Sequence, residues 1–178
     1  MNIHFERLSL NHIEMGWLKW IQNIDPHANT EFARIPPNKE SLIKIVDSTN
    51  DNDIWLAALY SEDSNPSDRI YFANVHIAPI NWIDRRCTFG RLIGDPSIRG
   101  KGLGTLLTKS IVNYCFTSLN MYKVTAGCLS TNQAAIKSNL KAGMTQEAIL
   151  KRDRFYNKEY VDSYLFAAWN DNWNSQLL

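Results

Sequence analysis

The first residues combine a strand pattern with an amphipathic helix pattern. Alternating apolar positions predict a strand over residues 3–8. A helix is expected over residues 11–23, opened by Asn11 with Glu14 three residues later, which is a variant of the capping box. The apolar face of this helix consists of Ile13, Trp17, Trp20 and Ile21.

The rest of the chain alternates strand and helix patterns. A second helix should run from its Asn38 cap to residue 48, after an irregular, proline-containing connection at residues 25–37. Strands are predicted over residues 54–61, 70–78, 85–94, 123–129, 145–151 and 160–169, and helices over residues 103–119 and 132–142, with a turn at residues 79–84. This order predicts a single mixed α/β domain, residues 1–178, with a parallel crossover.

Composition agrees with one ordinary globular domain. The chain has 178 residues, of which 44% are hydrophobic and 21% charged. A formal net charge of +1 and the lack of a basic stripe give no reason to expect nucleic acid as a partner. No signal peptide or membrane-spanning apolar run is recognised, so a cytoplasmic location is expected. Cys87, Cys115 and Cys128 lack the spacing of a zinc or disulfide framework and are expected to be small, buried hydrophobic side chains.

The sequence RGKGLG at residues 99–104 is the strongest candidate for a binding site. It joins a predicted strand to a predicted helix, and its glycines leave backbone N–H groups uncovered at a helix N-terminus, where anions bind. Arg99 and Lys101 add positive charge. The alternative is a plain flexible turn. A nucleotide P-loop is excluded because no Lys-Ser or Lys-Thr follows the last glycine, and the glycine spacing is not that of a dinucleotide fold.

Two motifs in order resemble the GNAT superfamily of acetyl-CoA-dependent N-acetyltransferases. The first is the RGKGLG turn, which matches the (Arg/Gln)-x-x-Gly-x-(Gly/Ala) loop of that family. The second is the segment from Asn132 to Met144, which resembles the N-x-x-(A/S)-I…K-x-G-F helix. The sequence FYNKEYVD at residues 155–162 is similar to the hairpin that ends the domain in one branch of this family. Members of that branch acetylate ribosomal-protein N-termini, spermidine and amino-sugar nucleotides.

The resemblance implies a mostly antiparallel sheet with one parallel, splayed strand pair, residues 85–94 and 123–129, with helices on both faces and acetyl-CoA as cofactor. The backbone amides of Leu92 and Ile93 would bind the pantetheine arm and the thioester oxygen. Pyrophosphate would lie on the loop and helix start, a set of residues comprising Arg99, Gly100, Lys101, Gly102, Leu103, Gly104 and Thr105. Asn132 would hold a pantetheine amide, and its alternative role is an ordinary helix cap.

The expected chemistry is direct attack of a neutral amine on the thioester, which requires removal of an ammonium proton. The chain departs from the family pattern twice: Asn139 stands where many members have a Tyr that acts as the acid, and Thr88 stands where a Glu base is common. Asn139 is expected to donate a hydrogen bond to the departing sulfur without delivering a proton. His76 and Asp84 are therefore the candidate bases. The alternative for His76 is a hydrogen-bonded, half-buried side chain.

The acceptor site is expected in the connection between the first two helices, together with the 79–84 turn. Its candidate residues are Trp20, His27, Phe32, Arg34 and Trp82. Aromatic and basic groups favour an amino sugar on a nucleotide as the small-molecule acceptor. The alternatives are a protein N-terminus or a polyamine, and a non-catalytic module that binds acetyl-CoA. A monomer or a homodimer is expected.

Overall fold

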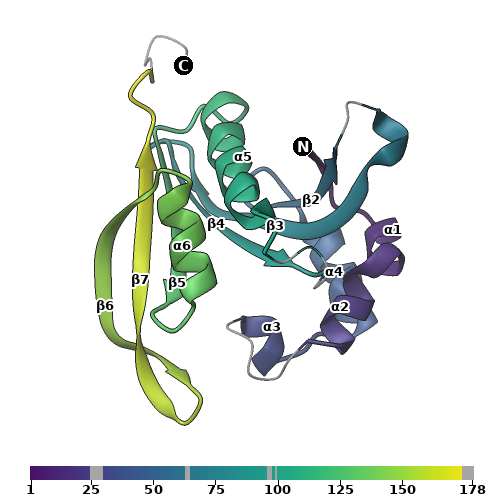
Figure 1. Cartoon of the computed structure of the whole chain (residues 1–178), viewed down its shortest axis with the longest axis horizontal. Coiled ribbons are helices and arrows are strands. Elements are labelled where there is room, and N and C mark those ends of the chain that lie inside the picture. Colours follow the sequence, from purple (N-terminus) through teal and green to yellow (C-terminus); the bar gives the residue numbers. More distant parts are fainter. Residues whose placement is uncertain (25–29, 63–64, 96–97, 99, 174–178) are drawn as a thin grey trace. The chain divides into compact units, whose positions relative to one another are not determined.

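A computed structural model describes residues 1–24, 30–62, 65–95, 98 and 100–173. Seven strands form one mixed sheet in the order β1-β2-β3-β4-β5-β7-β6 (Figure 1). The strands are β1 (Asn2–Arg7), β2 (Ile54–Ser61), β3 (Ile70–Asn81), β4 (Arg86–Ile93), β5 (Lys123–Leu129), β6 (Thr145–Tyr156) and β7 (Glu159–Trp169). β4 and β5 pair in parallel, whereas β1 with β2, β5 with β7 and β6 with β7 pair antiparallel. The predicted fold class is confirmed.

The helices are short in the first part of the chain and longer in the second. They are α1 (Leu10–His12), a π-helical segment (Ile13–Trp17), α2 (Leu18–Gln22), α3 (Glu31–Arg34), α4 (Lys39–Ser48), a 3₁₀ turn (Pro66–Asp68), α5 (Leu103–Thr117) and α6 (Gln133–Lys141). Among the described residues, no helix has the length and apolar character needed to cross a membrane.

The chain forms two compact units. The first consists of Met1–His76 and Arg91–Leu103, and the second of Ile77–Gly90 and Gly104–Leu178. The chain therefore passes from one unit to the other within β3, within β4 and at the start of α5.

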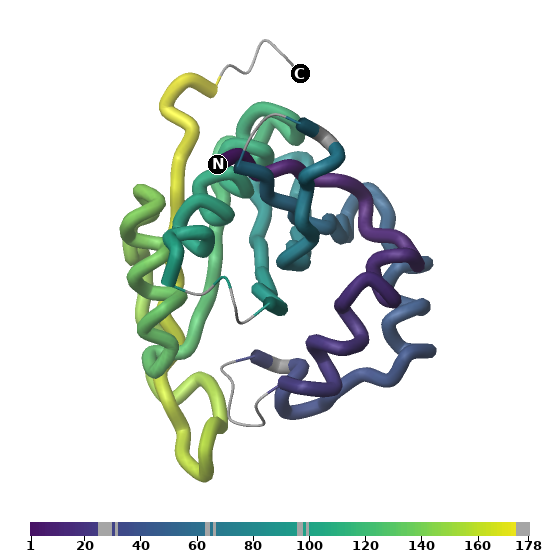
Figure 2. The backbone as a smooth tube through the Cα atoms, turned by 45° about the vertical axis from the view of Figure 1, so that its right-hand side comes forward, coloured from purple at the N-terminus to yellow at the C-terminus, as the bar shows by residue number. Residues whose placement is uncertain are grey.

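The first unit is held by helices packed on β2 and β3. Trp17 and Leu42 are fully buried with Ala57 of β2, and Tyr71 of β3 belongs to the same cluster. The π-helical segment Ile13–Trp17 lies alongside α4 (Figure 2). Burial of these apolar surfaces supplies the main driving force for folding of this unit.

The core of the second unit consists of buried side chains from α5 and from strands β5 and β7. Leu107, Ile111 and Cys115 of α5 are completely buried, as are Val124 of β5 and Phe166 of β7. Cys87 and Cys115 are free, buried thiols, as expected, while Cys128 is half-buried. The pKa of the Cys115 thiol is raised, mainly by a hydrogen bond with Cys87 and secondly by burial, so this side chain stays protonated.

The structure differs from the predicted layout in the start of one helix, the end of one strand and one additional short helix. The first helix begins at Leu10 and is capped by Ser9, not Asn11, because the Ser9 N–H donates to Nδ1 of His12 at 3.1 Å. A short helix, α3, lies inside the connection expected to be irregular. β6 runs to Tyr156, well beyond its expected end at residue 151, and accommodates this length through a register shift and a positive φ at Arg152.

The turn after β3 is also shifted. The strand continues past residue 78 to Asn81, with Ile77 and Ile80 both buried. Asn81 then closes the turn, because its Oδ1 accepts from the Asp84 N–H and its amide donates to Asp84 Oδ2, both at 2.8 Å. An asparagine side chain that bonds the backbone a few residues on is a common way to end a strand.

Candidate acetyl-donor and acceptor sites

The glycine turn of the first unit has an open backbone. Gly100 and Gly102 have φ values of +79° and +80°, a region that favours glycine, and among the described residues beyond the immediate chain neighbours no atom lies within 4 Å of a Cβ built at either. Lys101 between them is exposed, and Leu103 after them is 2% exposed, which anchors the turn. Arg99 lies outside the described residues. The turn is therefore a cradle that side chains at these two positions would fill.

In the second unit, the first turn of α5 is bonded to α6. The carbonyl of Gly104 accepts from the Thr108 hydroxyl at 2.8 Å and from the Ser138 hydroxyl at 3.1 Å. The two hydroxyl oxygens are themselves 3.0 Å apart. Thr105 stands half-buried in this first turn. These bonds hold the helix start at one position relative to α6.

The β4–β5 ladder covers only the first half of β4. Its pairs run from Arg86 opposite Lys123 to Phe89 opposite Ala126, after which β4 continues through Leu92 to Ile93. Both of these residues are half-buried, and the Leu92 side chain packs against the core of the first unit. In the same unit, the Gly94 N–H donates to the Phe72 carbonyl at 2.9 Å.

The second motif forms α6. Asn132 is its N-cap, and its side-chain oxygen accepts from the Ala135 N–H at 3.1 Å, so the helix-cap role is confirmed. The side-chain nitrogen is a second functional group on the same residue. Asn139, one residue after Ser138 in this helix, is 1% exposed.

A pair of threonine hydroxyls occupies the strand position where a carboxylate base was considered. The Thr125 hydroxyl donates to the Cys87 carbonyl at 3.2 Å, so the Thr88 hydroxyl is the donor in the 2.8 Å contact between the two. Hydroxyls of this kind do not titrate near neutral pH. This point of β4 therefore supplies hydrogen bonds and no proton acceptor of its own.

The two candidate bases have different surroundings. His76 of β3 is about one-third exposed, with its Nε2 2.8 Å from Asp53 Oδ1 and its ring stacked on Trp55 at 4.1 Å. Asp84 lies on the turn after β3, where it accepts from Asn81 and pairs with Arg86 Nε at 3.2 Å. The hydrogen-bonded, half-buried description of His76 is confirmed, and Asp84 has a structural partner on either side.

The candidate acceptor residues of the first unit are packed against other aromatic rings. Trp20 lies 4.6 Å from Tyr71 and so close to the Gly94 backbone that a Cβ there would come within 1.8 Å of the indole. Phe32 lies 6.5 Å from both Trp17 and Trp55. Arg34 is exposed, and His27 lies outside the described residues.

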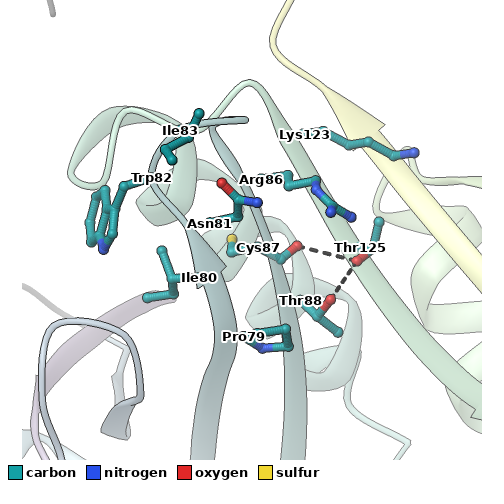
Figure 3. Close-up of a pocket in the computed structure, with 10 residues that line it drawn as sticks. All are labelled: Pro79, Ile80, Asn81, Trp82, Ile83, Arg86, Cys87, Thr88, Lys123 and Thr125. Carbon is teal, nitrogen blue, oxygen red and sulfur yellow. Dashed lines mark hydrogen bonds between the residues drawn. The ribbon is translucent and has the colours of Figure 1, made fainter.

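Trp82 lies in the second unit, beside a pocket of about 590 Å³ (Figure 3). The Trp82 indole stands on one side of this pocket, and Arg86 and Lys123 stand on the other. The Thr88 and Thr125 hydroxyls line it as well. Arg86 pairs with Asp84, and Lys123 pairs with Glu147, so each basic side chain already faces a carboxylate.

A family model described as "Acetyltransferase (GNAT) domain" matches residues 6–145. The chain belongs to the GNAT acetyltransferase family. This confirms the resemblance carried by the two motifs, and acetyl-CoA is the donor that enzymes of this family use.

The GNAT chain is similar to several known proteins. It is 36% identical over 86 residues to the spermidine N(1)-acetyltransferase of Escherichia coli K12, an alignment covering 48% of this chain and 46% of that protein. The match therefore spans about half the length of that relative. The spermidine N(1)-acetyltransferase of Vibrio cholerae is 26% identical over 158 residues, covering 88% of this chain and 89% of that protein.

Solved structures share the GNAT fold over nearly the whole chain. A spermidine N-acetyltransferase chimera from Vibrio cholerae and hSSAT matches with a TM-score of 0.80, 16% identity and coverage of 97% of this chain and 98% of that one. The Vibrio cholerae spermidine N-acetyltransferase in complex with CoA and spermine matches with a TM-score of 0.75, 18% identity and coverage of 96% and 97%. At these identities the likeness establishes the fold.

Sequence reasoning missed three residues that the structure brings to these sites. Asp53 and Trp55 contact His76, and Thr125 contacts Thr88. The Thr125 contact could have been predicted from the sequence, because strands 85–94 and 123–129 were expected to be parallel neighbours. The Asp53 contact was not, because it joins residues 23 positions apart whose register no local pattern reveals.

Proposed function

We propose that this GNAT protein transfers an acetyl group from acetyl-CoA to a primary amine of a polyamine such as spermidine. The observation that carries the donor half is the open glycine turn, in which Gly100 and Gly102 have positive φ and free space at their Cβ positions. The acceptor class rests on the spermidine acetyltransferases among the relatives. These relatives favour the polyamine alternative over the amino-sugar nucleotide preferred from the sequence.

On this proposal, backbone groups hold the donor. The amides of Gly100 to Thr105 would bind the pyrophosphate, with Arg99 and Lys101 adding positive charge. The Leu92 and Ile93 amides would bind the pantetheine arm and stabilise the oxyanion that forms on attack. Asn132, whose side-chain oxygen caps α6, would use its nitrogen to hold a pantetheine carbonyl.

The reacting groups follow from the same proposal. Bound acetyl-CoA supplies an activated acyl group, so that the amine nitrogen forms the new C–N bond while the C–S bond breaks and CoA departs as a thiolate. His76 would accept the proton that the amine loses, since an imidazole can do so near neutral pH. Asn139 would donate a hydrogen bond to the departing sulfur, because an amide donates without giving up a proton.

One feature favours a second candidate, an acceptor that carries a negative group, such as an amino sugar on a nucleotide. Arg86, Lys123 and the Trp82 indole line the pocket of the second unit. The indole ring and the N–H groups of these two basic side chains, each of which is paired with one carboxylate, suit an anionic, planar molecule.

An amine panel tests the proposal. CoA release from acetyl-CoA would be followed with spermidine, spermine, an amino-sugar nucleotide and a peptide with a free N-terminus. We expect turnover with the polyamines. Turnover with the sugar nucleotide alone would select the second candidate. CoA binding without release in any arm would indicate a non-catalytic acetyl-CoA module.

A further inference from the structure

We propose that Asp53 is the positioning residue of His76, holding its ring so that Nδ1 faces the amine as the proton acceptor. The inference rests on the proposed function, in which His76 is the base, and adds a residue that the sequence motifs do not single out. Both residues belong to the first unit, where Asp53 directly precedes β2 and His76 lies on β3.

The contact with Asp53 decides which ring nitrogen carries the proton. Asp53 Oδ1 lies 2.8 Å from His76 Nε2, and an ionised carboxylate only accepts hydrogen bonds. Nε2 must therefore be the N–H donor, which leaves Nδ1 of the neutral ring unprotonated, with a lone pair that can accept a proton. Among the described residues, Nδ1 has no hydrogen-bond partner, and the side chain is 34% exposed.

Stacking on Trp55 fixes the plane of the same ring. The two centroids are 4.1 Å apart, and the ring planes differ by only 14°. Trp55 in turn packs against Trp17 at 5.8 Å and Phe32 at 6.5 Å, and its carbonyl accepts from the Leu8 N–H at 3.0 Å. The hydrogen bond and the stack together restrict both torsions of the His76 side chain.

Asp53 is itself held by its backbone. Its carbonyl accepts from the Asn50 N–H at 2.9 Å, and its N–H donates to the Asn50 carbonyl at 3.2 Å. The Asn50 side chain stiffens the turn by accepting from the Asn52 N–H at 2.8 Å. A carboxylate on such a closed turn is preorganised, as a positioning group must be.

A second histidine with a carboxylate partner shows what a purely structural pair looks like in this chain. His12 Nε2 also lies 2.8 Å from a carboxylate, that of Glu6. Its Nδ1, however, is occupied by the Ser9 N–H and hydroxyl at 3.1 and 2.9 Å, and its side chain is only 4% exposed. Of these two histidines, His76 is the one that keeps a nitrogen available for chemistry.

A double-mutant cycle on the whole chain tests the proposal with spermidine and acetyl-CoA as substrates. Asp53→Asn, which preserves shape and exposure, should lower kcat roughly tenfold or more, while the KM for acetyl-CoA stays within about twofold. The same substitution in a His76→Gln background should have no further effect on kcat, because Asp53 acts only through the imidazole. Asp53→Ala provides a second variant, with folding checked by circular dichroism.

Glu6→Gln is the matched control, since it breaks a histidine–carboxylate pair of the same length and should leave kcat within about twofold of wild type. Equal losses of kcat for Asp53→Asn in the wild-type and His76→Gln backgrounds, that is with and without the imidazole, would overturn the proposal. So would an unchanged kcat in both Asp53 variants. Nitrogen NMR of the wild-type protein decides the tautomer independently of activity, and a proton on Nδ1 of neutral His76 would also contradict it.

Failure of the proposed function has a different signature. In that case the wild-type protein would show no turnover with any amine of the panel, and the NMR spectrum would still report whether Asp53 holds Nε2–H. Turnover that survives His76→Gln at the wild-type rate would remove His76 as the base, and the positioning role of Asp53 with it.

Discussion

Gly102 is the residue where donor binding can be separated from folding. Gly102→Ala should weaken CoA binding by about 1–3 kcal/mol, because the new Cβ fills the space that a phosphate would approach. Gly143→Ala is the matched control: Gly143 has a φ of +92° and the same empty surroundings, but it follows α6 and not the glycine turn. Both variants should lose about 1–2 kcal/mol of stability from the positive φ. Calorimetry that gives both variants wild-type CoA affinity would remove the turn from the donor site.

The buried Tyr71 hydroxyl should matter for stability. It donates to Asn74 Oδ1 at 2.6 Å, and burial, the larger cause, raises its pKa above the ordinary tyrosine value despite the opposing effect of that bond. Tyr71→Phe leaves the Asn74 oxygen buried without this donor, which should cost about 1–3 kcal/mol in urea unfolding. Tyr60→Phe is the control, since its ring contact with Phe72 at 5.5 Å is retained and the change should stay below about 0.5 kcal/mol. Equal effects of the two substitutions would contradict this assignment.

Among the secondary-structure elements, the β6–β7 hairpin has a turn residue in an unfavourable conformation. Asn157 and Lys158 both have positive φ, +49° and +68°, which is the pattern of a type I′ hairpin turn. Lys158→Gly should stabilise the protein by about 0.5–1 kcal/mol, because glycine adopts this conformation without the steric cost that lysine carries. Lys137→Gly on the exposed side of α6 should instead destabilise it by about 1 kcal/mol. Thermal unfolding that places Lys158→Gly below wild type would contradict this prediction.

Element types were more predictable than element ends. Helix and strand periodicity located the seven strands and the longer helices correctly, and the Asn38 cap is confirmed by its 2.8 Å bond from the Ser41 N–H. The start of the first helix was missed because His12, not an acidic side chain, completes the Ser9 cap. The end of β3 was predicted too early because the turn after it is closed by hydrogen bonds between Asn81 and Asp84. No proline or glycine marks the first residue of this turn.

For the molecule as a whole, the path of the chain predicts cooperative unfolding. β3 and β4 each contribute residues to both compact units, so neither unit is a continuous piece of chain. We expect one thermal transition whose calorimetric and van't Hoff enthalpies agree, as for a single domain. Two resolved transitions in differential scanning calorimetry would contradict the single-domain prediction for residues 1–178. A shift of the single transition to higher temperature on addition of CoA would report binding to the folded state.

The family and the donor loop could be read from the amino-acid sequence alone. Glycine spacing around residues 99–104 and the Asn132 helix motif are local patterns, and local backbone requirements depend only on neighbouring residues. The surroundings of the other side chains depend on the folded chain. Trp20, expected to bind the acceptor, packs against Gly94, and His76, for which half-burial was the alternative, is paired with Asp53. Such contacts join distant segments, and their partners follow from strand register and packing, which no short stretch of sequence specifies.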